Sequence, residues 1–242
     1  MSSTPTLPAL PDDWQRALVV VAHPDDIEYG LAAAVARWTD DGRTVTYLLA
    51  TRGEAGIDTM DPTEAAVLRA QEERDGAAEV GVEIVEFLDH SDGVVEYGLP
   101  LRRDIARIIR ARRPDALFCL THRERFAGGG TNQADHRVVG QAAMDAARDA
   151  GNRWIFPELN ADDEPWGGAR FIAYASSPEP THAVGVDGHV EAAVSSLEAH
   201  ARYLEALGPD YPSPRDLLTG ILTQGGRLSG TEYGVGFEVF DL

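Results

Sequence analysis

The sequence contains no lysine: all 21 of its basic residues are arginine. This absence excludes Schiff-base catalysis, a phosphate-binding loop with its lysine, and covalent attachment of pyridoxal phosphate. The sequence has one cysteine, Cys119, so an intrachain disulfide and a cysteine-cluster metal site are excluded as well. Cys119 lies in the apolar run 116–120, and we interpret it as a small buried hydrophobic residue and not as a nucleophile.

A long hydrophobic run is also missing. No stretch of about 18 apolar residues occurs, so we expect no membrane insertion. Residues 1–14 have neither the basic nor the apolar region of a signal peptide, and they are predicted to form a flexible tail of a cytoplasmic protein. A net charge of −19 predicts that the chain does not bind nucleic acid. The length of 242 residues fits one domain spanning 1–242.

The order of the predicted elements indicates an α/β fold. Strands are predicted at 17–22, 44–50, 83–88 and 116–120, alternating with helices at 28–40, 63–80, 101–112 and 135–150. This alternation is typical of a mostly parallel sheet with helices on both faces. The last third is less regular, with short strands predicted at 154–156, 171–175, 183–186 and 234–240 and helices at 190–207 and 215–223.

A His-Pro-Asp-Asp motif, His23 to Asp26, directly follows the first predicted strand. The carboxyl edge of such a sheet is where open α/β folds bind ligands, and Pro24 makes the turn stiff. An imidazole and a carboxylate suit Zn²⁺ or another divalent first-row ion, and the second carboxylate is free to act on water. The alternative, that Asp25 and Asp26 cap the next helix, accounts for one aspartate but not for the preceding His-Pro.

A second polar motif, Asn132 to Arg137, opens the helix after the fourth predicted strand. It therefore lies at the same edge of the sheet. His136 is a candidate third metal ligand. Asp135 is a candidate to orient a neighbouring ring nitrogen, or it is simply the helix cap.

These motifs resemble the LmbE-like or PIG-L superfamily of zinc-dependent N-deacetylases. The resemblance rests first on Ala22-His23-Pro24-Asp25-Asp26 with the later Asp135-His136. The loop 51–56 (TRGEAG) is similar to the family's T-x-G-E-x-G loop, and 69–82 is similar to its R-x-x-E…AA…GV helix. Together the motifs cover about residues 17–150. The resemblance implies a Rossmann-like three-layer fold.

The resemblance also implies a role for each matching residue. One Zn²⁺ per chain would be held by His23, Asp26 and His136, with other divalent first-row metals as alternatives. Asp25 would be the general base for the attacking water, and Asp135 would orient its neighbours. Arg69 matches a substrate-binding arginine of the family. Its alternative role is an i,i+4 ion pair with Glu73 on a helix face.

One position departs from the family pattern. The family commonly has His-x-Asp-His, and the first histidine of that pattern is Gln133 here. Glutamine can donate a hydrogen bond to an oxyanion but cannot shuttle a proton. Three outcomes are open. Asp25 serves as both base and acid, His182 or His122 takes the role of the missing histidine, or the enzyme is impaired. His182 is the preferred replacement and a candidate substrate-binding residue.

The predicted function is removal of the acetyl group from an N-acetylglucosamine-type amino sugar or a related small-molecule conjugate. Alternatives are a deacylase or amidase of a secondary metabolite, such as a glycopeptide or thiol conjugate, and a non-catalytic metal-dependent binding protein. A binding protein would have no need of the base Asp25. A homo-oligomer is compatible with the sequence, and the remaining histidines at 90, 189 and 200 are expected at the surface.

Overall fold

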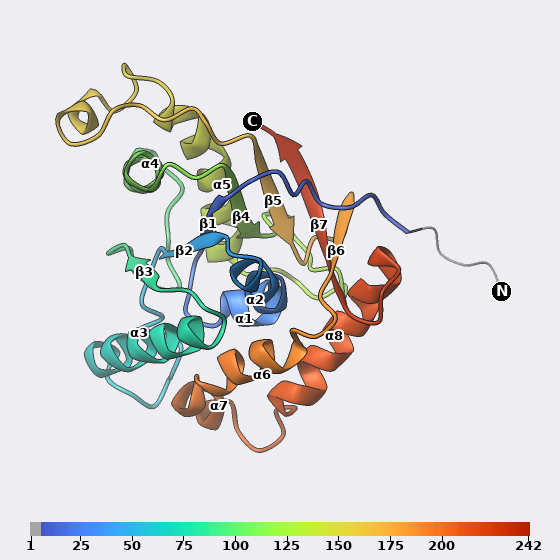
Figure 1. Ribbon diagram of the computed structural model, residues 1–242. Helices are drawn as coiled ribbons and strands as arrows, with labels where there is room; N and C mark the ends of the chain where they lie inside the picture. Colours follow the sequence, from blue (N-terminus) through green and yellow to red (C-terminus); the bar gives the residue numbers. More distant parts are fainter. Residues whose placement is uncertain (1–5) are drawn as a thin grey trace.

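Figure 1 shows the computed structural model of the chain, which describes residues 6–242. Strands and helices alternate through the first two-thirds of the chain. The elements are β1 (Arg16–Val21), α1 (Asp26–Gly30), α2 (Ala32–Asp40), β2 (Thr44–Leu49), α3 (Pro62–Glu79), β3 (Ile84–Phe87), α4 (Leu99–Arg112), β4 (Ala116–Leu120), α5 (Ala134–Ala150), a 3₁₀ turn η1 (Pro157–Ala161), β5 (Phe171–Ala175), β6 (His182–Gly185), α6 (Val190–Glu198), α7 (Ala201–Leu207), α8 (Pro214–Ser229) and β7 (Gly234–Asp241).

The seven strands form one mixed sheet in the order β3-β2-β1-β4-β5-β7-β6. The first five strands in this order are parallel, and Val19 of β1 pairs with Tyr47 of β2 and Phe118 of β4. β7 runs antiparallel to both β5 and β6. The prediction of an α/β fold with a mostly parallel sheet and a less regular C-terminal part is therefore confirmed.

Helices cover both faces of the sheet, which makes three layers (Figure 1). Val19 and Val21 of β1 point into a core shared with α2, α6 and α8. Leu18 and Val20 point into the opposite core, which is shared with α4 and α5. Because both faces of β1 are buried, the strand is a continuous apolar run and could be identified in the sequence.

α8 packs closely against β7 in the C-terminal part. A Cβ atom on Gly225 of α8 would overlap the backbone carbonyl of Gly234 at the start of β7, so this approach requires glycine. The contact fixes α8 beside the sheet, where it forms one wall of the cavity described below.

Two predicted helices are each divided in two. The predicted helix 28–40 is α1 and α2, separated by Leu31 with φ −132° and ψ −27°. The predicted helix 190–207 is α6 and α7, separated at Ala199 and His200, and the ψ of His200 is 43°. Apolar periodicity does not detect a break of one or two residues, because the apolar face resumes after it.

The prediction that His200 is exposed is wrong. The break between α6 and α7 turns this side chain inward, and it is 0% exposed. Its Nε2 atom faces carboxylate oxygens of Glu28 and Glu73 at 3.6 and 3.8 Å. His90 and His189 are half-buried instead of exposed.

Two further predictions need correction. Residues 154–156 form turns and not a strand, and Trp154 is 80% exposed. Residues 7–14 are not a flexible tail, since Leu10 and Trp14 are buried in the core and Ala9 bridges to Ala183 of β6. Residues 1–5 of the predicted tail lie outside the described residues. Within residues 6–242, no helix combines the length and the apolar character needed to cross a bilayer.

Candidate active site

The carboxyl ends of β1 and β4 lie side by side at the centre of the sheet. From β1 the chain proceeds to β2 on one side, and from β4 it proceeds to β5 on the other. In open α/β sheets, ligands bind at such a switch point. The motif His23–Asp26 follows β1, and Asp135 and His136 lie in the first turn of α5, which follows β4. The topology thus brings both sequence motifs to one place.

The two aspartates of the first motif point in different directions. Asp25 has a left-handed backbone with φ 90°, which costs a residue other than glycine about 1 kcal/mol or more. Its Oδ1 atom lies 3.2 Å from Arg69 Nη2. Asp26 Oδ2 accepts hydrogen bonds from the backbone N–H groups of Ala22 and His23 at 3.0 and 2.9 Å. Among the described residues neither the Asp25 nor the Asp26 carboxylate makes a hydrogen bond that caps α1, so capping does not account for the pair.

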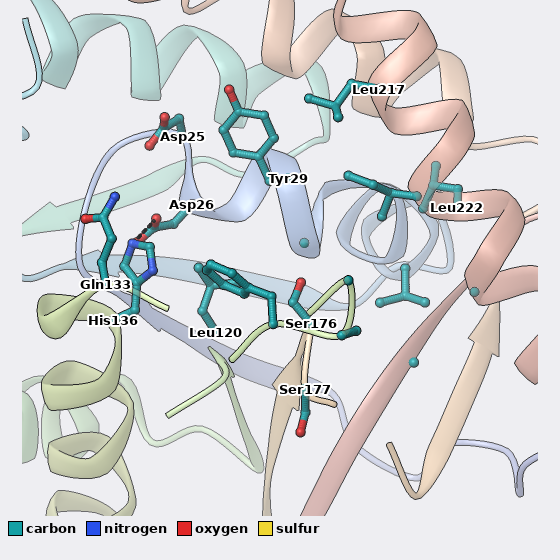
Figure 2. A pocket seen from close by; sticks show the side chains of 18 of the residues that line it. Asp25, Asp26, Tyr29, Leu120, Gln133, His136, Ser176, Ser177, Leu217 and Leu222 are labelled. Atoms are coloured by element: carbon teal, nitrogen blue, oxygen red, sulfur yellow. Dashed lines mark ion pairs between the residues drawn. The ribbon is translucent and has the colours of Figure 1, made fainter. Parts of the chain in front are cut away.

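The tautomer of His136 is fixed by Asn132. The Asn132 amide nitrogen donates to the backbone carbonyls of Thr121 and Arg123 at 2.6 and 2.9 Å, so its Oδ1 atom faces His136 Nδ1 at 2.9 Å. His136 Nδ1 therefore carries the proton, and Nε2 has a free lone pair. That Nε2 atom lies 2.9 Å from Asp26 Oδ1, the contact drawn as a dashed line in Figure 2.

His23 is held from its other side by two carboxylates. Its Nε2 atom lies 3.0 Å from Asp92 Oδ1 and 3.3 Å from Asp135 Oδ2. Asp135 is itself fixed by N–H donors of the loop 93–95, at 2.8 and 3.2 Å. His23 Nε2 is thus the donor, and Nδ1 faces His136 Nε2 at 3.1 Å. Asp135 orients His23, a candidate metal ligand, and not its sequence neighbour.

This arrangement fits a divalent cation. His23 Nδ1, His136 Nε2 and the Asp26 carboxylate lie within 4.8 Å of one another. Because the outer nitrogen of each ring is already hydrogen-bonded, unshared electron pairs converge on one point, and they repel unless a cation lies between them. Two nitrogens and one oxygen with room for a fourth ligand are the donor set of catalytic zinc sites.

The charges around His23 also favour a cation. Burial acts to lower the pKa of His23, but Asp26, Asp135 and Asp92 outweigh it and raise the pKa to about 12. Burial acts to raise the pKa of Asp26, but His136 and His23 outweigh it and hold the pKa well below its usual range. A metal ion at this site would replace a proton.

Arg69 of α3 holds the Asp25 turn. Its guanidinium donates to the carbonyl oxygens of Pro24 at 2.5 Å and Gly53 at 3.1 Å, in addition to its ion pair with Asp25. The same guanidinium lies 4.0 Å from the centre of the Tyr203 ring. These contacts explain why Arg69 is buried although it is charged.

The glycines of the loop 51–56 make room for this arginine. A Cβ atom on Gly53 or on Gly56 would overlap the Arg69 guanidinium. The loop 51–56 and the helix motif that begins at Arg69 therefore form one structural unit. The alternative i,i+4 pair with Glu73 is not formed, since Glu73 accepts a hydrogen bond from the Asp25 N–H at 3.2 Å and Arg69 faces Asp25.

Asp25 is suited to accept a proton near neutral pH. Burial raises the pKa of Asp25 to about 6, although the Arg69 charge acts to lower it. A general base works best when its pKa lies near the operating pH. Burial likewise raises the pKa of Glu73, directly behind Asp25, well above its usual range.

Gln133 immediately precedes α5, and its exposed side chain lines the same cavity as Asp25. The two candidate replacement histidines lie elsewhere. His182 begins β6, the edge strand farthest from β1 on that side of the sheet, and His122 packs on Tyr174 with ring centres 4.5 Å apart. Neither is among the described residues that line the cavity, so the structure does not bring His182 or His122 to the site.

The sequence reasoning missed Asp92. It lies in the loop after β3, at the same edge of the sheet as the two motifs, and the run Asp89-His90-Ser91-Asp92 was an available signal. A buried cluster of Glu28, Glu73 and His200 was missed too. Glu28 and Glu73 come from α1 and α3 and His200 from the break between α6 and α7, and no sequence spacing connects them.

The site opens into a cavity of about 720 Å³. Figure 2 shows Asp25, Asp26, Gln133 and His136 together at one end, with Leu217 and Leu222 at the other. Tyr29, Leu120 and Ser176 lie between the two ends.

Comparison with known proteins gives consistent matches. A family model described as PIG-L, GlcNAc-PI de-N-acetylase, matches residues 18–147. The chain is 26% identical over 235 residues to a diacetylchitobiose deacetylase of Thermococcus kodakarensis, covering 94% of this chain and 84% of that protein. It is 30% identical over 181 residues to a 1D-myo-inositol 2-acetamido-2-deoxy-alpha-D-glucopyranoside deacetylase of Kineococcus radiotolerans, covering 58% of this chain and 49% of that protein.

A solved structure shares the fold. It is the N,N'-diacetylchitobiose deacetylase of Pyrococcus horikoshii in complex with an inhibitor, with a TM-score of 0.84 and 24% identity. The match covers 94% of this chain and 84% of that chain.

Proposed function

The chain belongs to the PIG-L family, and on that premise we propose that it is a zinc-dependent N-deacetylase. The proposed substrate is an N-acetylglucosamine-type amino sugar or a small conjugate of one. The named relatives support the sugar class, since each is a deacetylase of an acetylated amino sugar.

The observation that carries the proposal is that neighbouring residues of the turn 23–26 are placed for different roles. His23 and Asp26 converge with His136 on one point, while the neighbouring Asp25 carboxylate is not part of this group and is paired with Arg69. A metal site that only binds a ligand does not need a separate carboxylate beside it with a pKa of about 6.

In this proposal Zn²⁺, when bound by His23, Asp26 and His136, would polarise the amide carbonyl and lower the pKa of a coordinated water. Asp25 takes the proton from the attacking water. Arg69 keeps the Asp25 carboxylate in place. Gln133 donates a hydrogen bond to the oxygen that becomes negatively charged.

The leaving amine needs a proton, and Asp25 is the proposed source. The carboxyl group that accepted the proton from water returns it to the nitrogen as the C–N bond breaks. This assignment follows from the positions of the other candidates, since His182 and His122 lie away from the cavity and Gln133 cannot shuttle a proton.

The experiment is a metal determination followed by an assay of amine release from a panel of N-acetylated amino sugars and their conjugates. The proposal predicts about one Zn²⁺ per chain and turnover of at least one panel member. Protein that retains no divalent metal and turns over no substrate would contradict it, and would favour a binding protein.

Asp25→Asn tests the base. Asparagine tolerates the left-handed backbone at this position, so the fold should be kept. Amine release is expected to fall by about 10²–10⁴-fold, the usual contribution of a general base. Metal content should stay at the wild-type level, whereas Asp26→Asn should lose metal. Full activity of Asp25→Asn would contradict the mechanism.

A further inference from the structure

The polar end of the cavity continues into an apolar compartment, which we call the apolar arm. Its apolar lining residues are Leu217, Ile221, Leu222 and Leu228 of α8 and Val235 of β7, and Gln224 is the polar residue of α8 in the lining. Figure 2 shows Leu217 and Leu222 facing the cavity from the side opposite the polar end. The arm and the polar end form one continuous cavity.

α8 carries more apolar surface than the core requires. Leu218 is buried in the core at 1% exposure, and Leu222, at 5%, belongs both to the core and to the lining of the arm. Leu217, Ile221 and Leu228 follow one another at helical spacing on the neighbouring stripe, which lines the arm. Ile221 remains 37% exposed, so this stripe is open to an apolar ligand.

The cavity has the polarity gradient of a site for an amphiphile. A sugar has hydroxyl groups that need hydrogen-bonding partners, and Gln133, Asp92 and Arg69 lie at the polar end. Tyr29 lies between this end and α8 (Figure 2), and its hydroxyl is 3.0 Å from that of Tyr211, which also lines the cavity. Beyond them the lining is mostly aliphatic, and a sugar there would leave most of its hydroxyls unpaired.

We propose that the apolar arm receives the aliphatic chain of the substrate's N-acyl group, so that the chain is an N-deacylase that prefers acyl groups longer than acetyl. This inference rests on the proposed function, because it places the amide carbonyl at the metal site. The amino sugar then occupies the polar end, and the acyl substituent leaves the carbonyl carbon in the opposite direction, toward Leu120 and α8. Water adds across the C–N bond and gives a fatty acid carboxylate and the protonated amine.

The size of the cavity agrees with this substrate class. Its volume of about 720 Å³ lies well inside the usual range for sites that enclose a drug-sized ligand, roughly 300–1,000 Å³. A methyl group at the carbonyl would leave the aliphatic lining of α8 in contact with water. A chain of several methylenes would cover it.

The test compares amine release from glucosamine carrying N-acetyl, N-butanoyl, N-hexanoyl or N-octanoyl groups. The value of kcat/KM should rise about two- to fourfold for each added methylene until the arm is filled. A parallel experiment measures kcat/KM for the methyl and octyl glycosides of N-acetylglucosamine. If kcat/KM rises for the octyl glycoside but not for the N-octanoyl substrate, the aglycone occupies the apolar arm and the proposal is overturned.

Two variants of α8 locate the effect. Ile221→Asp places a charge in the arm, and Thr223→Asp places the same charge on the exposed face of the same helix. The ratio of kcat/KM for N-octanoyl to N-acetyl should fall at least 10-fold in Ile221→Asp and stay unchanged in Thr223→Asp. An equal N-octanoyl to N-acetyl ratio in the wild type, Ile221→Asp and Thr223→Asp would overturn the proposal.

A binding measurement separates this inference from the proposed function. If no panel member is hydrolysed, the proposed function fails, but calorimetric binding of N-octanoylglucosamine still decides the role of the arm. Binding that weakens at least 10-fold in Ile221→Asp but not in Thr223→Asp supports the arm. Binding that is absent, or equal in both variants, overturns it.

Discussion

Gln133 occupies the position where the family commonly has a histidine. Its side chain is exposed and lines the cavity beside the second motif, so a substitution there changes chemistry with little effect on folding. A hydrogen-bond donor at this point can stabilise a developing oxyanion, and an imidazole could in addition protonate the leaving amine.

We therefore expect opposite effects from two substitutions of this residue. Gln133→Leu removes the donor and should lower kcat by roughly 10²-fold, the usual effect of losing one oxyanion donor. Gln133→His adds a proton donor and should raise kcat about 10-fold or more, with a new limb in the pH–rate profile near the pKa of the added imidazole. If kcat is unchanged in both variants, this side chain takes no part in the reaction.

At the scale of elements, the loop between β2 and α3 is shaped by the arginine it encloses. Gly53 has φ +65° and its Cβ position overlaps the Arg69 guanidinium. Gly42 has φ +82°, and apart from its chain neighbours no heavy atom of the described chain lies within 4 Å of its Cβ position. The two glycines have similar backbones and different neighbours, so they form a matched pair.

Substitution by alanine separates backbone strain from displacement of Arg69. Gly42→Ala should lower the free energy of unfolding by about 1–2 kcal/mol, because it needs a left-handed backbone. Gly53→Ala should lower it by more, because its Cβ also displaces the buried Arg69 guanidinium. Gly53→Ala should in addition reduce amine release at least 10-fold, since Arg69 holds Asp25. Denaturation and activity measurements on both variants check this, and equal activity of the two would show that Arg69 does not position the base.

The break between α6 and α7 buries His200 against carboxylates from two other helices. Glu28 of α1, Glu73 of α3 and Asp25 face this ring. Burial acts to lower the pKa of His200, but these carboxylates outweigh it and raise the pKa to about 9. Among the described residues both ring nitrogens are buried without a hydrogen-bond partner, so ion pairing is the main interaction of this ring.

This shift predicts how stability depends on pH. The folded pKa of about 9 lies above the ordinary value of 6.5, so the contribution of His200 is complete below pH 6.5 and is lost as the pH rises through 9. The difference corresponds to roughly 3 kcal/mol. Urea denaturation of the metal-free protein should show this decline, and His200→Gln should be less stable at pH 6 and decline less. Parallel pH dependence in the two proteins would contradict the assignment.

At the scale of the whole molecule, residues 7–14 belong to the folded body. Trp14 is 1% exposed and its ring centre lies 5.1 Å from that of Trp38 and 5.5 Å from that of Phe118. Ala9 bridges to Ala183 of the edge strand β6. The segment therefore connects the first residues of the described chain to the last strands of the sheet.

Trp14→Ala should consequently destabilise the protein strongly. Removal of a buried tryptophan lowers the free energy of unfolding by about 3–5 kcal/mol. Trp154→Ala is the matched control, since Trp154 is 80% exposed and its loss should change the free energy by less than about 0.5 kcal/mol. Chemical denaturation distinguishes the two, and a small effect at Trp14 would mean that this segment contributes little to the core.

The sequence by itself determined the fold class and the two motifs that form the candidate metal site. Both follow from local signals. The apolar run of β1 is continuous because the strand is buried on both faces, and His23 and Asp26 follow directly from its end. Once β1 and β4 are parallel neighbours, their carboxyl ends must meet, so the pairing with His136 is predictable from topology.

The tertiary structure alone decided which side chains support these residues. Asp92, Glu73 and His200 reach the site from separate elements, and His182 does not reach it at all. Burial and side-chain direction depend on how helices pack over the sheet, which a local pattern does not encode. The apolar arm was undetectable for the same reason, because the periodicity of α8 does not tell which of its apolar stripes faces the core and which faces a cavity.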